Sequence, residues 1–429
     1  LINIVLLETD TRSSFTYEVN ADHLHDGEVK PGAKLSLSGQ SGRFDYLISG
    51  ETEPRWANRK GFESSFLANG TKNDTVSRRT ITDQQPTTMS SNIGYQFSEN
   101  DVAHLNFQYN QNDAPEELDR VITDYLTSPP TIKSQFEDIS NESDFWELGG
   151  DYEHTFRGGN RWRGLFIINQ KKDDRTRERF DLNDSNQKDI FLKTFNQYEE
   201  EIFRTSYSMD LSERQDLEFG IERAKTTLES TLRLGLASQG APSSEFGNLV
   251  PSNTSNAVVE ETRHEVFAIH NWRLSDRMSL ESTIIYEEST IRQTGDISKE
   301  RDFSFIRPKV DYRFDITPSL QLRATIEKDV AQLSFNDFTA NIPPIGDDDQ
   351  NTFAGNPDIR QEQSWRYDLN LEYRFNEDNG VINTNLYYQD LEDLIDRIDV
   401  STPTAIQSAN GNIGDGKRHG GSIDSSYRL

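Results

Sequence analysis

The stretch that decides the fold is Tyr367-Asp368-Leu369-Asn370-Leu371-Glu372-Tyr373-Arg374-Phe375, in which apolar and polar residues alternate without a break. A period of two places successive side chains on opposite faces of a β-strand, whereas a helix repeats its apolar residues every three or four positions. The same alternation occurs in residues 320–326 and 103–109. The sequence therefore predicts an all-β protein whose strands have one apolar face and one polar face.

Short polar turns divide the predicted strands into hairpins. Gly, Asn, Asp and Ser in these turns supply the positive φ angles and local hydrogen bonds that tight hairpins require. Short and long connections alternate, so all tight turns are predicted at one end of the strands and all long polar loops at the other. The turns are Ser41-Gly42, Glu99-Asn100, Gly158-Gly159-Asn160, Ser212-Glu213, Ser275-Asp276, Thr317-Pro318 and 377–380, and the long loops are 54–85, 112–143, 171–198, 226–261, 330–363 and 392–416.

The composition of the 429-residue chain departs from that of a soluble domain, with 33% hydrophobic residues and a formal net charge of −28. Such values are typical of disorder or of a fold that needs no thick apolar core. The negative charge argues against nucleic acid as a partner, because phosphate binding depends on clustered Lys and Arg. The chain has no cysteine, which removes disulfides and thiolate metal sites. No apolar run approaches the roughly 20 residues of a membrane-spanning helix.

Three features favour an antiparallel transmembrane β-barrel over a soluble sandwich. Predicted strands of about 9–13 residues match the 9–11 residues of a tilted strand in a bilayer and exceed the usual length in soluble sheets. Short turns on one side and long loops on the other are typical of outer-membrane barrels. Charges in mid-strand, such as Glu372 and Arg323, suit a water-filled interior, while the apolar faces carry no charge. Alternation predicts about 15–16 strands.

Residues 354–373 resemble a segment of the TonB-dependent outer-membrane receptors. Barrels of that family commonly carry a loop of the form GNPxLxPExS that leads into a long alternating strand. Ile359 stands here in the Leu place and Gln361 replaces the second proline. The opening residues 1–6 look like the strand that closes the plug domain of that family, and residues 412–421 are similar to its entry into a later barrel strand. The positions that match the loop are Gly355, Asn356, Pro357, Glu362 and Ser364.

The resemblance implies a barrel of about 22 strands filled by an N-terminal plug. We expect residues 1–10 to be the end of the plug and residues 11–429 to be the barrel domain, truncated at its C-terminus, with the rest of the plug missing. The resemblance also implies the outer membrane of a Gram-negative bacterium, contact with outer-membrane lipid, and uptake of a scarce ligand. The TonB energy-coupling protein would drive that uptake through the missing plug.

Few residues offer other chemistry. His23 and His25 share a face if their segment is extended and can then hold a metal, but the sequence shows no third ligand. Asp347-Asp348-Asp349 offers carboxylates to calcium, although its spacing is not that of an EF-hand loop and a solvated loop tip also explains it. No nucleophile elbow, phosphate loop or dinucleotide motif is present. We therefore expect no catalytic residue, no metal, no cofactor and no enzymatic activity.

The sequence thus predicts a TonB-dependent outer-membrane receptor that binds a scarce small ligand and takes it up through a plugged β-barrel. Two alternatives stay open: a passive porin-like outer-membrane channel that closes with about sixteen strands, and a secreted β-protein that binds glycans. The ligand is open among iron chelate, cobalamin, sugar and peptide. The sequence identifies no ligand-binding residue.

Overall fold

The computed structural model describes residues 12–24, 27–67, 69–184, 186–339, 352–353, 355–375, 379–400 and 407–428. Three predictions, on residues 1–10, on His25 and on Asp347–Asp349, fall outside the described residues, and so does part of the predicted turn 377–380. The chain divides into two compact units. The first comprises residues 1–150, 167–200 and 227–258, and the second comprises residues 151–166, 201–226 and 259–429.

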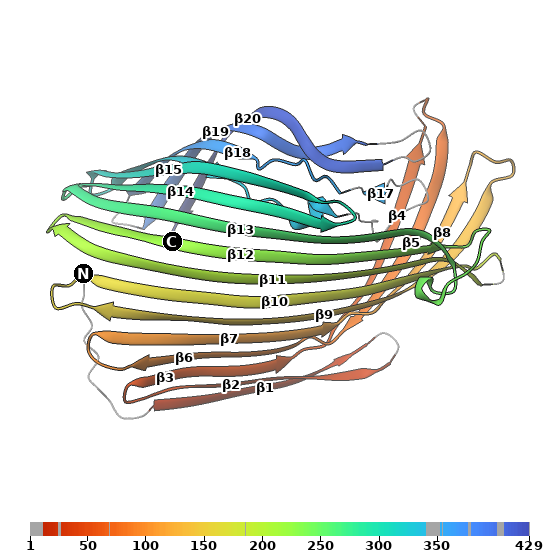
Figure 1. Ribbon diagram of the computed structural model, residues 1–429, viewed down its shortest axis with the longest axis horizontal. Helices are drawn as coiled ribbons and strands as arrows, with labels where there is room; N and C mark the ends of the chain where they lie inside the picture. The colour runs from red at the N-terminus through yellow and green to blue at the C-terminus, as the bar shows by residue number, and fades with distance from the viewer. Residues whose placement is uncertain are drawn as a thin grey trace. The chain divides into compact units, whose positions relative to one another are not determined.

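Nearly all of the described chain is β-strand, which confirms the predicted all-β fold (Figure 1). Within the described ranges, the helical elements are two short 3-10 turns, η1 (Ser244–Phe246) and η2 (Phe335–Phe338). None of the helices described there is long and apolar enough to cross a membrane. The strands pair in antiparallel fashion, except that β17 runs parallel to β20. Their bounds are β1 Arg12–His23, β2 Val29–Ser41, β3 Phe44–Thr52, β4 Arg55–Phe66, β5 Lys72–Gln84, β6 Thr87–Gln96, β7 Asp101–Asp113, β8 Glu116–Asp124, β9 Thr131–Thr155, β10 Arg161–Asp181, β11 Gln187–Ser212, β12 Gln215–Leu236, β13 Val250–Ser275, β14 Met278–Gly295, β15 Lys299–Thr317, β16 Leu320–Val330, β17 Thr352–Phe353, β18 Gln363–Phe375, β19 Gly380–Asp399 and β20 Gln407–Tyr427.

The predicted short turns that lie wholly within the described ranges are confirmed as hairpin turns. β2 and β3 are joined through Gly42, whose φ is 59°. Between β9 and β10, Gly159 has a φ of 87°, and its N–H donates to the carbonyl of Phe156 at 2.9 Å. Glycine adopts positive φ without the steric penalty of a Cβ, which is why it occupies these corners.

Most of the predicted long loops are strand rather than irregular chain, which corrects that part of the expectation. Residues 171–198 form the distal half of the β10–β11 hairpin, and residues 226–261 are mainly the ends of β12 and β13. β11 and β13 each have 26 residues, more than twice the roughly 9–11 residues that a tilted strand needs to cross a bilayer. The long connections therefore exist as extended hairpins, apart from 330–363, which is largely irregular where it is described.

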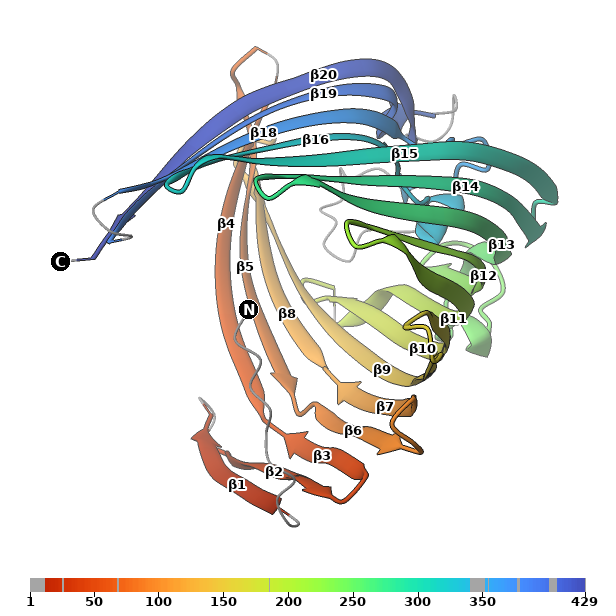
Figure 2. The same ribbon diagram turned by 90° about the vertical axis from the view of Figure 1, so that its left-hand side faces the viewer.

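Three prolines interrupt neighbouring strands of the first unit at one level. β4 continues β3 beyond Pro54, β6 continues β5 beyond Pro86, and β8 continues β7 beyond Pro115. Proline has no N–H, so each one removes a ladder hydrogen bond. The ladder survives beside the gaps, because Glu53 N donates to Pro86 O at 3.3 Å and Asp83 N to Pro115 O at 3.2 Å. β4, β5 and β8 consequently turn away from β3, β6 and β7 along a crease (Figure 1, Figure 2).

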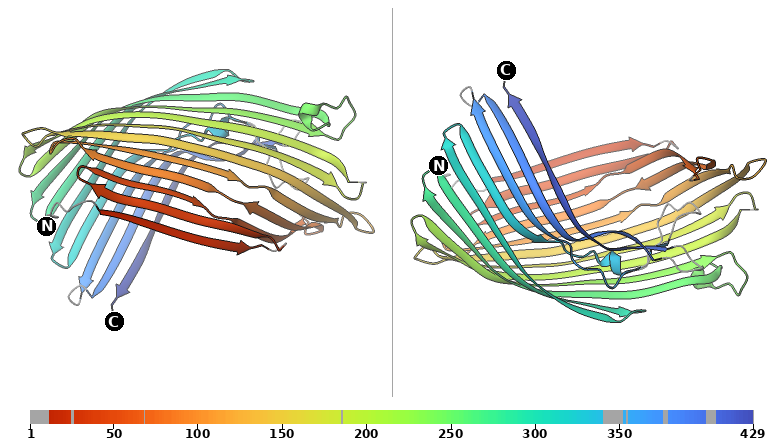
Figure 3. Two further views of the ribbon diagram at one scale, coloured as in Figure 1. Left: turned by 90° about the horizontal axis from the view of Figure 1, so that it is seen from below. Right: turned by 90° about the horizontal axis from the view of Figure 1, so that it is seen from above.

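Joining each interrupted pair, and leaving out the two-residue β17, gives sixteen long strands in the described part of the chain. This number agrees with the sequence-based estimate. In the second unit, β14, β15, β16, β18, β19 and β20 pair in that order (Figure 3).

The register of the second unit separates apolar from charged residues by face. One row across five strands is apolar, and the row beside it, on the opposite face, is mostly charged or polar. Side chains on the apolar face are open to the surroundings: Leu386 is 52% exposed and Ile306 56%. The apolar row is Leu280, Tyr312, Ala324, Leu369 and Leu386, and the polar row is Glu281, Asp311, Thr325, Asp368 and Tyr387.

The first unit shows the same separation across β1, β2, β3, β6 and β7. An apolar row, Phe15, Leu37, Ile48, Ser91 and Phe107, is interrupted by a single serine. The alternate row carries Ser36, Ser49, Ser90 and Gln108. His104 lies on this polar face, opposite Gly94 on β6.

Burial in this protein is the reverse of that in a water-soluble domain. Glu137 is completely buried and Arg120 is 2% exposed, while Phe15 is 63% exposed. In soluble proteins, charged residues are almost never fully buried unless they are paired, and large exposed apolar surfaces mark contact with another apolar phase. Two apolar faces open to the surroundings and a buried charged face are the pattern expected of strands that have lipid on one side.

Candidate functional site

The loop before β18 is fastened to other strands by the side chain of Asn356. Its amide Nδ2 donates to the carbonyl of Asn410 on β20 at 2.8 Å, and its Oδ1 accepts from Asp358 N at 2.9 Å. Its own backbone N–H donates to the carbonyl of Asp337 at 2.7 Å. Asn410 in turn donates through Nδ2 to the Asp337 carboxylate at 2.7 Å. Asn356 therefore joins η2, the motif loop and β20.

Gly355 and Pro357 flank this contact. A Cβ at position 355 would lie 2.3 Å from the carbonyl oxygen of Phe338, so only glycine fits there. Pro357 lies half-buried in the turn that follows. Ile359, which stands in the Leu place of the motif, is completely buried, and Gln361, in the second proline place, is 3% exposed. Both departures from the motif are therefore accommodated in the interior.

Glu362 and Ser364 lie where the loop becomes strand. The Glu362 carboxylate accepts from Ile395 N on β19 at 3.3 Å, and its backbone carbonyl accepts from Ala331 N at 2.8 Å. Ser364 is opposite Asp329 on β16 and Leu391 on β19. The five predicted motif residues thus lie in one loop, where Asn356 and Glu362 form hydrogen bonds with neighbouring elements and Gly355 lies against the Phe338 carbonyl.

Charged side chains of the same loop reach two further strands. Lys299 on β15 donates to the Asp358 carboxylate, and this hydrogen bond holds the pKa of Asp358 below its usual value. Arg360 pairs with Asp393 on β19. Asn412 on β20 donates through Nδ2 to the Arg360 carbonyl at 2.9 Å, and its Oδ1 accepts from Arg360 N at 2.8 Å. The loop is therefore held from both sides by polar contacts.

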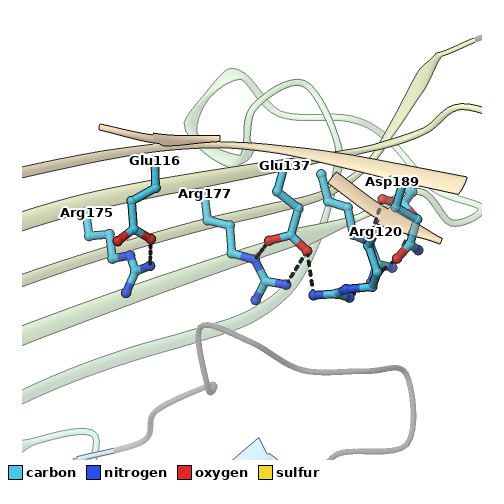
Figure 4. A network of polar contacts seen from close by, with 8 residues as sticks. Glu116, Arg120, Glu137, Arg175, Arg177 and Asp189 are labelled. Atoms are coloured by element: carbon cyan, nitrogen blue, oxygen red, sulfur yellow. Dashed lines mark hydrogen bonds and ion pairs between the residues drawn. The ribbon is translucent and has the colours of Figure 1, made fainter. Parts of the chain in front are cut away.

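A second group of polar side chains, the arginine network, lies on one face of β8, β9, β10 and β11 in the first unit (Figure 4). Glu137 on β9 is at its centre. Its carboxylate contacts Arg177 at 2.5 and 2.8 Å and Arg120 at 3.2 Å. The network also contains the ion pairs of Arg175 with Glu116 at 3.6 Å and of Arg179 with Asp189 at 3.0 Å.

Positive charges outnumber negative charges in the arginine network. It sets four arginines, Arg120, Arg175, Arg177 and Arg179, against three carboxylates, Glu116, Glu137 and Asp189. Arginine stays protonated in proteins. The network thus carries a net positive charge in a chain whose total is −28.

A comparable group of ion pairs in the second unit is balanced in charge. Arg263 on β13 contacts Glu222 and Glu265, each at 3.3 Å. Arg307 on β15 contacts Glu265 at 2.7 Å and Glu287 at 3.2 Å. Arg204 on β11 also contacts Glu222 at 3.8 Å, so three arginines face three carboxylates in this group, and the arginine excess of the first unit is absent from it.

The structure tests the metal hypotheses only in part. His23 ends β1 opposite Val29, whereas its proposed partner His25 and the acidic run Asp347–Asp349 are outside the described residues. In the described ranges, no three His, Cys, Asp or Glu side chains are grouped closely enough to hold a metal ion.

The arginine network is not among the sites predicted from the sequence. The signal was present in Arg175, Arg177 and Arg179, which are spaced two apart and so share one face of a strand. They lie in 171–198, which was assigned to a loop, and a loop assignment gives no reason to compare alternate residues.

A family model described as "TonB dependent receptor-like, beta-barrel" matches residues 57–429. Among curated proteins, no match was found. Three similar solved structures are the copper transporter OprC (TM-score 0.66, 12% identity), the ferric yersiniabactin uptake receptor FyuA from Yersinia pestis (0.58, 11%) and the FrpB iron transporter from Neisseria meningitidis (0.57, 14%). They cover 98%, 99% and 99% of this chain, which spans only 61%, 60% and 60% of theirs. At this identity the likeness concerns the fold.

Proposed function

The chain belongs to the family of TonB-dependent receptor-like β-barrels, and from that premise we propose that it is the barrel of an outer-membrane receptor in a Gram-negative bacterium. In this role it binds a scarce small ligand outside the cell and lets it pass through the outer membrane. Residues 11–429 are barrel in this proposal, and residues 1–10 are the end of the plug domain that occupies the lumen.

The observation that carries the proposal is the reversed burial of apolar and charged side chains. Exposed apolar rows on both units would be unstable in water, at about 25 cal/mol for each Å² of apolar surface left wet. Against lipid the same rows are stabilising, and charged faces turned inward line an aqueous path. The 26-residue strands β11 and β13 are long enough to carry hairpins beyond the bilayer, where a ligand is first met.

TonB and the proton gradient are the proposed energy source. Concentrating a scarce ligand requires free energy, and a barrel by itself supplies none. The proposal assigns that work to TonB acting through the plug, and it assigns to the motif loop around Asn356 the task of keeping β18, β19 and β20 in fixed register.

The experiment that tests the proposal uses the complete gene in a Gram-negative host. Radiolabelled candidates of each ligand class (an iron chelate, cobalamin, an oligosaccharide and a peptide) are offered to cells that carry or lack the gene, each with and without TonB. We expect uptake of one class that needs both the gene and TonB and that stops when a protonophore collapses the gradient.

Two results would contradict the proposal. Uptake that needs the gene but persists without TonB would identify a passive channel. Recovery of the complete protein as a soluble monomer without detergent would exclude the membrane barrel altogether. A variant with Gly355→Ala, which should weaken the motif loop, is a useful comparison, because it should lower the amount of folded receptor in the outer membrane without changing which ligand is taken up.

A further inference from the structure

Arg78 on β5 lies directly opposite Arg120 on β8, and Arg120 lies opposite Gln135 on β9. Like charges that face each other across a strand pair destabilise the sheet. Arg120 has the Glu137 carboxylate at 3.2 Å. Arg78, by contrast, makes no ion pair with any carboxylate of the described residues. The register thus places an unneutralised guanidinium beside the arginine network.

The neighbours of Arg78 leave room for its side chain. On β4 the residue opposite is Gly61, and a Cβ there would lie 2.6 Å from Arg78 Nε. The side chain of Arg78 therefore lies across Gly61, and Arg78 stays partly exposed. This arrangement keeps the charge at the edge of the network and accessible to a small solute.

Gln135 supplies an independent observation. Its side chain is 1% exposed, and its Oε1 accepts from Arg120 Nη1 at 3.4 Å. Its amide Nε2 is buried and donates to no acceptor among the described residues. A buried donor without an acceptor costs about 1–3 kcal/mol, so the position favours an acceptor atom that arrives from outside.

We propose that Arg78, Arg120 and Gln135 form a binding site for an oxyanion, so that the ligand taken up carries carboxylate or phosphate groups. The site rests on the proposed function, which it deepens by naming the ligand's charge. An oxyanion between Arg78 and Arg120 relieves their repulsion, because guanidinium groups bind such oxygens in bidentate fashion. The same oxygens accept from Gln135 Nε2, the donor that the described chain leaves without an acceptor.

The test is calorimetric titration of the complete protein in detergent at low ionic strength. Citrate serves as the carboxylate probe, pyrophosphate as the phosphate probe and sucrose as the uncharged reference. We expect at least one of the two anions to bind, sucrose not to bind, and the affinity to fall as salt screens the charges.

Substitutions locate the site. Arg78→Gln should weaken anion binding about tenfold, a loss of about 1.4 kcal/mol, and Arg78→Lys should lose part of it because lysine lacks the planar fork. Arg79→Gln is the matched control. Its side chain belongs to the opposite face of the same strand and donates to Asn58 Oδ1 at 3.3 Å, so its loss should leave anion binding unchanged.

Three outcomes would overturn the site: no binding of either anion at concentrations on the order of 10 mM, equal binding of sucrose, or equal weakening by Arg78→Gln and Arg79→Gln. If Arg78→Gln does not fold, anion-dependent thermal stabilisation of the unsubstituted protein decides, because a ligand that binds only the folded state must raise its Tm. Uptake that does not require TonB would contradict the proposed function but not the anion site. A titration without anion binding would contradict only the anion site.

Discussion

Individual side chains in the motif loop have little freedom to change. Gly355 is the clearest case, because a Cβ would lie 2.3 Å from the Phe338 carbonyl oxygen. We expect Gly355→Ala to destabilise the folded protein by about 1–3 kcal/mol, the usual cost of forcing an extra carbon into a packed site. Thermal unfolding in detergent measures this. Gly158→Ala is the matched control, since a Cβ there meets nothing within 4 Å, and an equal effect of both changes would contradict the steric argument.

A pH effect is expected from Asp358. The hydrogen bond from Lys299 holds the pKa of Asp358 below its usual value, so the folded state binds a proton there less readily than the unfolded state. The pair therefore adds stability above the unfolded pKa, about 3.9, and loses it as the pH falls through the lower folded pKa.

Asp358→Asn measures the contribution of that pair. The pair is exposed, so the variant should lose at most about 1 kcal/mol at neutral pH and should become indistinguishable from the parent in strong acid. Urea unfolding at a series of pH values gives the difference. A difference between the two proteins that grows as the pH falls would contradict the assignment.

At this scale the sequence predicts the motif residues but not their partners. The resemblance indicated Asn356 and Glu362 as a group. Their acceptor and donor, Asn410 O and Ile395 N, belong to β20 and β19. These partners depend on the register between elements, and residue types alone do not specify register.

Single strands show the strongest contrast between neighbouring residues. Leu369 and Asn370 are adjacent on β18, and they lie opposite Ala324 and Arg323 of β16 on different faces. We expect Leu369→Arg to cost about 2–4 kcal/mol, the penalty for arginine near the midplane of a lipid-facing surface. Asn370→Arg would face the like charge of Arg323, which costs up to about 1 kcal/mol across a strand pair, and should still cost less than Leu369→Arg. Folding into lipid vesicles, followed by urea titration, compares them, and equal penalties would contradict opposite environments.

Removing one partner of a buried cross-strand ion pair should destabilise the protein far more than removing one partner of an exposed pair. Glu137→Gln removes the carboxylate that Arg120 and Arg177 both contact, and we expect a loss on the order of 3–5 kcal/mol. The exposed pair Arg292 and Glu300 provides the comparison: Glu300→Gln should change stability by no more than about 1 kcal/mol. Chemical unfolding of both variants measures the contrast, and a loss from Glu137→Gln as small as that from Glu300→Gln would argue against a buried network.

Strand existence was predictable where one face is apolar, and unpredictable where both faces are polar. Residues 367–375 alternate strictly and were assigned correctly. Residues 171–179 are polar on both faces, so no apolar period marks them as strand, and they extend because their backbone pairs with neighbouring strands. The strands that follow Pro54, Pro86 and Pro115 were also not predicted, because a proline indicates the end of a strand. Here the chain resumes pairing immediately after each proline.

In the molecule as a whole, many large apolar side chains are exposed and several charged side chains are buried, the reverse of a water-soluble domain. With 33% hydrophobic residues and a net charge of −28, the chain has too little apolar surface for a thick dry core. The two units reach the same solution, which is to turn apolar rows outward and to pair charges within. The fold therefore explains the low hydrophobic content, because a barrel in lipid needs only a single apolar face on each strand.

The most direct test is to find which face of β18 touches lipid. The chain has no cysteine, so Tyr367→Cys, Asp368→Cys, Leu369→Cys and Asn370→Cys each give one site for a fluorescent label in the protein reconstituted into vesicles. Brominated acyl chains should quench labels at 367 and 369, and aqueous iodide should quench those at 368 and 370. The reverse pattern, or equal quenching at all four positions, would contradict the account.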